Sequence, residues 1–133
     1  MKVRCLYNTR EALSDYPGLS RYVQDGEFTV GQEFLVMGML LGEGRLAYLI
    51  DDGGVITASP VQLFEVTDSE LDSNWHFRAY TKDDEHYPYS EATWGYHELC
   101  FDDKHYEGLV EMEEQAMLLY YRRKIEAEKR LEE

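Results

Sequence analysis

The sequence is poor in proline, cysteine and long apolar runs, and each scarcity excludes a class of protein. Only 3 prolines and 2 cysteines occur among its 133 residues. Cys5 and Cys100 cannot make the disulfide framework of a small secreted domain, and a single bridge between them remains an alternative. The stretch MKVRCLYNTREAL lacks an apolar signal region, and no run approaches the ~18 apolar residues needed to span a bilayer. We therefore expect a cytoplasmic protein with free thiols and no membrane insertion.

Positive charge is also scarce. The 13 Lys and Arg are outnumbered by 27 Asp and Glu, which gives a formal net charge of −14. Most of this excess lies between Glu65 and Glu114, where 15 acidic residues accompany 3 basic ones and the formal charge is −12. Such a field repels nucleic acid and anionic lipid and attracts basic proteins. We expect no nucleic-acid partner, while solubility alone also explains an acidic chain.

The length and hydrophobic content predict one folded domain, residues 1–133, with residues 1–82 mainly in β-strands. Gly42-Glu43-Gly44 is a hairpin signal between two apolar runs. Several short strands with glycine turns are typical of a small curled antiparallel sheet of five or six strands, such as an SH3-like barrel. The clearest strand candidates are Val3–Tyr7, Phe34–Leu41, Arg45–Asp51 and Trp75–Thr81.

Residues 102–133 change to a helical period. Between residues 105 and 131 the chain has no proline and a single glycine, Gly108. The apolar stripe predicts a long amphipathic helix from about residue 104 to 131, packed across the sheet, and hence an α+β fold. The stripe is wider than one face, so it predicts either deep burial or a homodimer formed through this helix. Its members include Val110, Met117, Leu118, Tyr121 and Ile125.

An acidic and aromatic segment, residues 83–101, joins the two halves. It begins DDEHYPYSEATWGYHEL, and Pro88 and Gly95 disfavour a regular element. Tyr and Trp are the side chains that tend to dominate binding energy at interfaces, and acids among them favour a basic partner. The segment is therefore predicted to bind a basic protein, and the alternative is that its rings cover the sheet. The predicted binding residues are Asp83, Asp84, Glu85, Tyr87, Tyr89, Glu91, Trp94 and Tyr96.

Motifs for catalysis and metal binding are incomplete. His97-Glu98 begins the zinc pattern H-E-x-x-H, but Phe101 occupies the position of the second histidine. Cys100 lies in the apolar triplet LCF, which favours packing over nucleophilic catalysis. We therefore predict no metal, no cofactor and no enzymatic activity. The enzyme alternative is a small metal-dependent hydrolase built on His86, His97 and His105.

Several longer sequence patterns are present along the chain. They are F-x-V-G-x-E-F-x-V-x-G-M (28–39), AYLIDD (47–52), SP-V-x-LFEV-x-D (59–68), W-x-F (75–77) and WGYHEL…HYEGLVEMEEQA (94–116). Together they resemble small, acidic bacterial proteins similar to the immunity proteins of polymorphic toxin systems. This resemblance implies a stand-alone β-rich domain with a C-terminal helix that neutralises a toxin.

The function expected from these features is non-enzymatic protein binding. In the leading hypothesis the protein is an immunity or inhibitor protein that occludes the active site of a basic toxin, such as a nuclease. The alternative within the same class is a generic SH3-like adaptor or a homodimeric interaction domain.

Overall fold

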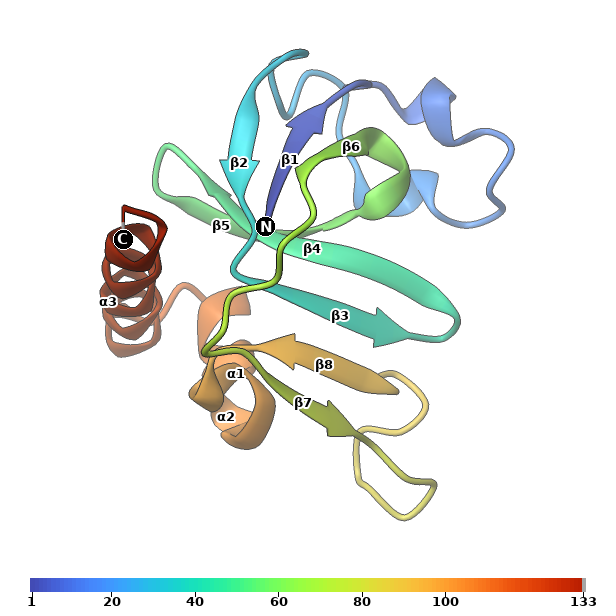
Figure 1. Ribbon diagram of the computed structural model, residues 1–133. Coiled ribbons are helices and arrows are strands. Elements are labelled where there is room, and N and C mark those ends of the chain that lie inside the picture. The colour runs from blue at the N-terminus through green and yellow to red at the C-terminus, as the bar shows by residue number, and fades with distance from the viewer. Residues whose placement is uncertain (133) are drawn as a thin grey trace.

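The computed structural model describes residues 1–132 and contains two open antiparallel sheets (Figure 1). The smaller sheet has the order β2-β1-β6, and its strands are β1 (Lys2–Cys5), β2 (Glu33–Leu35) and β6 (Phe64–Asp68). The larger sheet has the order β5-β4-β3-β8-β7. Its strands are β3 (Gly38–Gly42), β4 (Arg45–Asp52), β5 (Val55–Pro60), β7 (His76–Ala79) and β8 (Ala92–Gly95). The α+β class is confirmed, but the single curled, SH3-like sheet is replaced by two sheets that do not close.

The chain passes from the smaller sheet to the larger one at Val36 and Met37. The sequence predicted one strand over Phe34–Leu41, because nearly every residue in that run is apolar. The structure divides the run between β2 and β3, since Val36 packs into one hydrophobic core and Met37 into another. Two buried neighbours that face different cores give the same apolar pattern as a strand covered on both sides.

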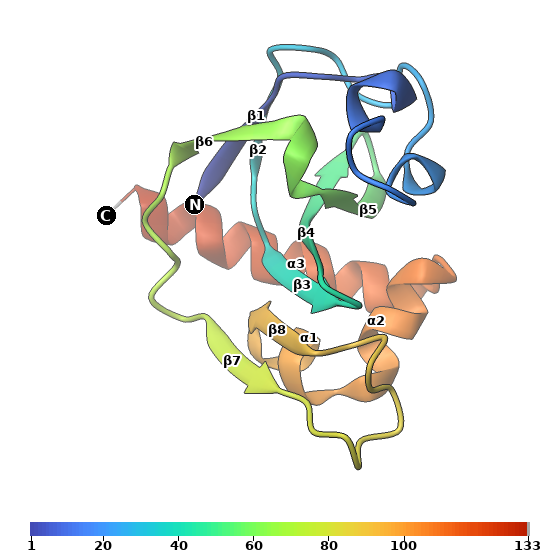
Figure 2. The ribbon, with the colours of Figure 1, turned by 90° about the vertical axis from the view of Figure 1, so that its right-hand side faces the viewer.

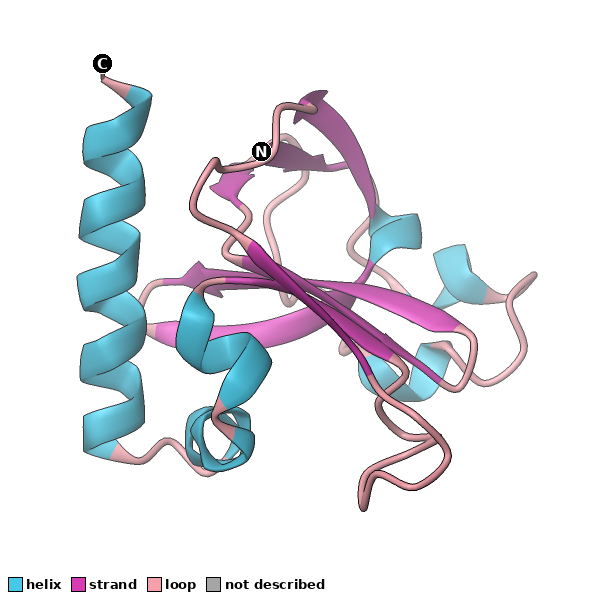
Figure 3. Ribbon diagram, turned by 60° about the horizontal axis from the view of Figure 1, so that its bottom comes forward, coloured by secondary structure: helices cyan, strands magenta, loops and turns pink. Residues whose placement is uncertain are grey.

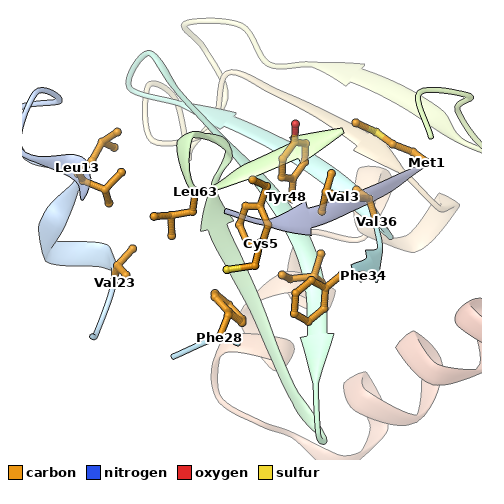
Figure 4. Packing of buried hydrophobic residues seen from close by; sticks show 13 residues of the cluster. Met1, Val3, Cys5, Leu13, Val23, Phe28, Phe34, Val36, Tyr48 and Leu63 are labelled. Atoms are coloured by element: carbon orange, nitrogen blue, oxygen red, sulfur yellow. The ribbon is translucent and has the colours of Figure 1, made fainter. Parts of the chain in front are cut away.

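The two cores lie on opposite faces of the five-stranded sheet. Along β4, Tyr48 and Ile50 face the first core, while Leu49 faces the second. The first core lies between the two sheets (Figure 4), and Phe28 and Phe34 meet there edge to face with ring centroids 5.4 Å apart. Short 3-10 helices η1 (Arg10–Leu13), η2 (Ser20–Tyr22) and η3 (Val61–Leu63) border this core.

Both cysteines are buried free thiols, so the structure contains no bridge between Cys5 and Cys100. Cys5 packs in the first core, whereas the Cys100 thiol points towards the carbonyl oxygens of Thr93 and Gly95. Burial raises the pKa of both thiols. Among residues 1–132, no helix is long and apolar enough to cross a membrane.

The C-terminal third forms three helices instead of the single helix predicted over residues 104–131 (Figure 2). They are α1 (His97–Phe101), α2 (Asp103–Val110) and α3 (Glu114–Leu131). The side chain of Asp102 caps α2 by accepting the N–H of Lys104 at 3.1 Å. The chain turns at Met112, where φ is 56°, and Gly108 then lies against Ala116. A Cβ at Gly108 would stand 2.8 Å from the Cβ of Ala116, so this close approach requires glycine.

Helix α3 packs in the second core and runs crosswise to the strands at one end of the sheet (Figure 3), where ion pairs with distant parts of the chain fix it. The phenol of Tyr120, which is fully buried, donates to Asp51 at 2.8 Å, and Lys124 reaches the same carboxylate at 2.8 Å. The other two pairs are Arg123 with Glu98 and Arg130 with Asp72. The basic residues of α3 therefore bind partners far away in the sequence, which holds the helix against the sheet.

Candidate protein-interaction site

Residues 83–95 of the predicted binding segment, residues 83–101, lie in a hairpin of residues 76–95, which we call the acidic hairpin. It consists of β7, a loop over residues 80–91, and β8, and its loop projects away from the body of the protein (Figures 1 and 3). The segment is less irregular than predicted, because Ala92–Gly95 is a strand and His97–Phe101 is a helix. Gly95 belongs to β8 and pairs with Gly38, so it does not interrupt regular structure.

The base of the loop is fixed by Asp84. Its carboxylate accepts the Thr81 N–H at 2.6 Å and the Thr81 hydroxyl at 3.2 Å, and it lies 3.4 Å from the guanidinium of Arg78. The Thr81 N–H, followed by these other partners, holds the pKa of Asp84 below its usual range. Asp84 is therefore an internal support of the loop, and it is less available to a partner than the sequence suggested.

The C-terminal part of the loop is fixed by hydrogen bonds to the β3–β4 hairpin. The Glu43 N–H donates to the carbonyl of Pro88 at 3.1 Å, and the Glu91 N–H donates to Leu41 at 2.7 Å. Gly42 makes this contact possible, because a Cβ there would collide with the carbonyl oxygen of Tyr89. The loop is thus held at both ends before any partner binds.

Several predicted binding residues have exposed side chains on this loop. Asp83 and Glu85 are exposed, and neither forms an ion pair within residues 1–132. Tyr87 is exposed, and Tyr89, at 75%, is the most exposed large hydrophobic side chain in the described chain. Glu91 is half-buried.

Trp94 belongs to the strand part of the acidic hairpin. It is half-buried, and its ring packs on Phe77 of β7 with centroids 5.0 Å apart. Phe77 remains 53% exposed, although the sequence did not single it out. The alternating pattern placed Phe77 on one face of a strand. It gave no sign that other residues would leave this ring exposed. The two rings form an aromatic pair on the strands of the acidic hairpin.

Tyr96 is not part of this surface, and that prediction is corrected. It is only 6% exposed and packs in the second core, where its hydroxyl lies 2.6 Å from Nε2 of His105. Burial raises the pKa of Tyr96 and lowers the pKa of His105, so both rings are neutral near pH 7. Tyr96 thus covers the sheet, as the alternative reading of the segment proposed, while Tyr89 does not.

The histidines do not form a metal site. His105 is buried against Tyr96, His97 packs on His76 with ring centroids 5.3 Å apart, and His86 lies 3.9 Å from Glu107. Within residues 1–132, no group of three His, Cys, Asp or Glu side chains could hold a metal ion. The hydrolase alternative required His86, His97 and His105 to converge, and the structure places them in separate surroundings.

Further acids lie beside the acidic hairpin and were not predicted as site residues. Asp102, Asp103 and Glu107, from the start of α2, line a small hollow together with His86. Arg78 binds Asp103 at 2.7 Å and so ties α2 to β7. These acids belong to the −12 stretch of the sequence, but only the fold shows that they adjoin the loop.

A larger hollow of about 410 Å³ lies between α3 and residues 72–76. Arg123 and Arg130 face it, but Glu98 and Asp72 already bind their guanidinium groups. The bond from Arg123 lowers the pKa of Glu98 to about 2, so this carboxylate is ionised. The arginines of this hollow therefore offer no uncompensated charge to a ligand.

Comparison of the chain with family models, curated proteins and solved structures found no match. The resemblance to immunity proteins stays a prediction, and the functional argument depends on the geometry described above.

Proposed function

We propose that the protein is a non-enzymatic, cytoplasmic binding protein that uses the acidic hairpin to occlude a basic protein, most concretely a toxin of the nuclease type. The observation that supports this proposal is the contrast between a firmly held loop and its free side chains. The backbone of residues 80–91 is bonded at both ends, while the side chains of Asp83, Glu85, Tyr87 and Tyr89 are exposed and form no hydrogen bond or ion pair within residues 1–132.

Such an arrangement favours affinity for a physical reason. A loop that is already ordered loses less conformational entropy on binding than a flexible one. Tyr side chains bury a large area with few rotatable bonds, and in the centre of an interface each contributes about 2 kcal/mol or more. Tyr89 has the greatest area to bury, so we expect it to be the main anchor.

The charges of the hairpin would act mainly on the rate of encounter. Asp83 and Glu85, with the α2 acids Asp102 and Glu107 nearby, attract Lys and Arg side chains of a partner. Because these carboxylates are exposed, ions screen their field within about 10 Å at 0.1 M salt. The proposal therefore includes a strong dependence of association on salt.

The proposal is tested by identifying a basic protein that is encoded beside this chain. We expect expression of such a protein alone to arrest a bacterial host and co-expression of this chain to restore growth. Tyr89→Ala should weaken the complex about thirtyfold in Kd, which corresponds to about 2 kcal/mol. Tyr16→Ala is the matched control, because Tyr16 is also exposed but lies in the N-terminal loop. Equal affinity of the two variants contradicts the proposal.

Homodimerisation is a second candidate, favoured by apolar side chains on the outward side of the C-terminal helices. Leu118 and Ile125 of α3 are exposed, as are Val110 and Met112 at the turn between α2 and α3. A second copy of the chain would cover them. Light scattering over a range of concentrations tests this, and a monomer at every concentration contradicts it.

A further inference from the structure

An apolar groove of about 250 Å³ lies at the end of the five-stranded sheet beside the β3–β4 hairpin. Its floor comes from neighbouring strands, since Leu40 pairs with both Ala47 and Thr93, and Ala47 pairs with Pro60. Small side chains at these positions leave space above the sheet. Three tyrosines from separate elements line it: Tyr22 of η2, Tyr89 of the acidic hairpin and Tyr106 of α2.

One wall of the groove carries two arginines without acidic partners. Arg45, which lines the groove, donates to the Tyr22 hydroxyl at 2.7 Å, and Arg21 donates to the same oxygen at 2.9 Å. Both guanidinium groups also lie over the Tyr22 ring, at 5.0 Å for Arg21 and 5.4 Å for Arg45. Among residues 1–132, no carboxylate lies within ion-pair distance of either arginine, although acids outnumber bases two to one in this chain.

This cluster has spare hydrogen-bond donors. A phenol oxygen accepts two bonds, and the two arginines supply both, so the Tyr22 O–H proton is free to donate elsewhere. Each guanidinium has five N–H groups and uses one of them on Tyr22. Gly18 lets Arg45 lie close to the chain, because a Cβ there would be 3.3 Å from its Nη2. Donors that converge on one hydroxyl and lack a carboxylate partner within residues 1–132 are suited to binding an anion.

We propose that this groove binds a small apolar molecule that carries one carboxylate. The aromatic or aliphatic body lies on the floor of Leu40, Ala47 and Ala58, and the carboxylate meets Arg45, Arg21 and the Tyr22 hydroxyl. A flat aromatic body fits walls made of tyrosine rings, which pack well against other rings. The volume is below the usual range for drug-sized ligands, so the ligand has about a dozen heavy atoms.

The local charge fits a single negative group. Glu43 is the one acidic residue that lines the groove, and it lies on the turn of the β3–β4 hairpin. Arg45 balances Glu43 among the lining residues, and Arg21, which lies outside the lining but binds the Tyr22 hydroxyl, adds one positive charge within a chain of −14. A more highly charged anion, such as a phosphate ester, would be repelled more strongly by the remainder of the protein.

The test is a titration of the ¹⁵N-labelled full chain with 3-phenylpropionate, followed by amide chemical shifts. We expect saturable shifts at Ala47, Ala58 and Tyr89, and at least tenfold weaker binding of the uncharged 3-phenylpropanamide, because it lacks the charged hydrogen bonds. N-acetylphenylalanine carries the same chemistry as a polypeptide C-terminus. Tighter binding of that compound than of 3-phenylpropionate would assign the site to a chain end, and the reverse would assign it to a free acid.

Substitutions test whether the arginine cluster contributes to binding of the ligand separately from its contribution to the fold. Arg45→Gln should weaken 3-phenylpropionate at least tenfold, and Tyr22→Phe should weaken it severalfold while keeping the ring. Arg122→Gln is the matched control, because Arg122 is an exposed arginine on α3 away from the groove. The proposal is overturned if no saturable shift occurs up to about 10 mM, if the amide binds equally well, or if Arg45→Gln binds like Arg122→Gln. The groove shares Tyr89 with the protein-binding proposal, but the two can be tested separately, since reversing the charges of Asp83 and Glu85 leaves the arginine donors intact.

Discussion

Replacement of Asp51 by alanine should destabilise the protein strongly, because Asp51 joins β4 to α3. Its side chain is 9% exposed and accepts hydrogen bonds from Tyr120 and Lys124, both at 2.8 Å. Asp51→Ala leaves the buried Tyr120 hydroxyl without a partner, which costs about 1–3 kcal/mol. Lys124 is 25% exposed, so loss of its ion pair adds at most about 1 kcal/mol after screening by water.

The total expected loss in the free energy of unfolding is therefore about 1–4 kcal/mol. At about 4 °C per kcal/mol for a domain of this size, the melting temperature should fall by roughly 4–16 °C. Asp51→Asn keeps an acceptor for Tyr120 and should lose about half as much. The double variant with Tyr120→Phe should lose less than the sum of the single variants, because it removes both partners of one bond.

Urea denaturation followed by circular dichroism measures these differences, with Asp83→Ala as the control. Asp83 is exposed and unpaired in the described chain, so its replacement should change stability by less than about 0.5 kcal/mol. The reasoning is refuted if Asp51→Ala is no less stable than Asp83→Ala, or if the Asp51 and Tyr120 effects are additive.

Three further predictions concern buried groups. Burial holds the pKa of His105 below its ordinary value of 6.5, so its contribution to stability is complete above that pH and is lost as the pH falls below it. His105→Gln should remove that part of the decline in urea midpoints measured between about pH 7 and 5, and an unchanged slope contradicts the account. Gly42→Ala should cost about 1–3 kcal/mol and speed hydrogen exchange of the Glu43 and Glu91 amides, because the new Cβ displaces the loop that they bond; unchanged exchange contradicts that contact. Burial raises the pKa of Cys100 to about 11, so a thiol reagent at neutral pH should label it far more slowly in the native protein than in urea, and equal rates contradict its burial.

Local signals in the sequence predicted much of the β-structure. Gly42-Glu43-Gly44 marked the turn correctly, since Glu43 and Gly44 both have positive φ there and join β3 to β4 in register. The strand over Arg45–Asp51 was also correct to within one residue. These features depend on neighbouring residues alone, which is why periodicity and turn chemistry were sufficient.

Sequence patterns did not predict the features that depend on contacts between residues far apart in the chain. The spacing of Lys124 with Glu128 and of Glu126 with Arg130 is that of i,i+4 helical ion pairs, but Lys124 binds Asp51 and Arg130 binds Asp72. The helix break at residues 111–113 likewise depends on packing, because Gly108 must meet Ala116 across the turn.

The candidate site shows the same division between local and distant information. Composition identified the acidic hairpin as distinctive, and exposed Asp83, Glu85 and Tyr89 agree with that prediction. Composition could not distinguish the exposed Tyr89 from the buried Tyr96. Tyr96 is covered by His105 and the second core, and Tyr89 is not. Composition also could not find Arg21 and Arg45, whose meeting at Tyr22 joins segments far apart in the chain.

If a gene beside that of this chain encodes a basic protein, the association rate with that protein tests the central proposal most directly. The Asp83→Lys, Glu85→Lys variant should associate at least tenfold more slowly than the unaltered chain at low salt, because steering by exposed charges sets that rate. The Glu128→Lys, Glu132→Lys variant makes the same change of charge at exposed positions on and next to α3, and it should change the rate much less. The difference between the variants should shrink as salt screens the field. Equal association rates for the two variants at low salt would contradict binding through the acidic hairpin.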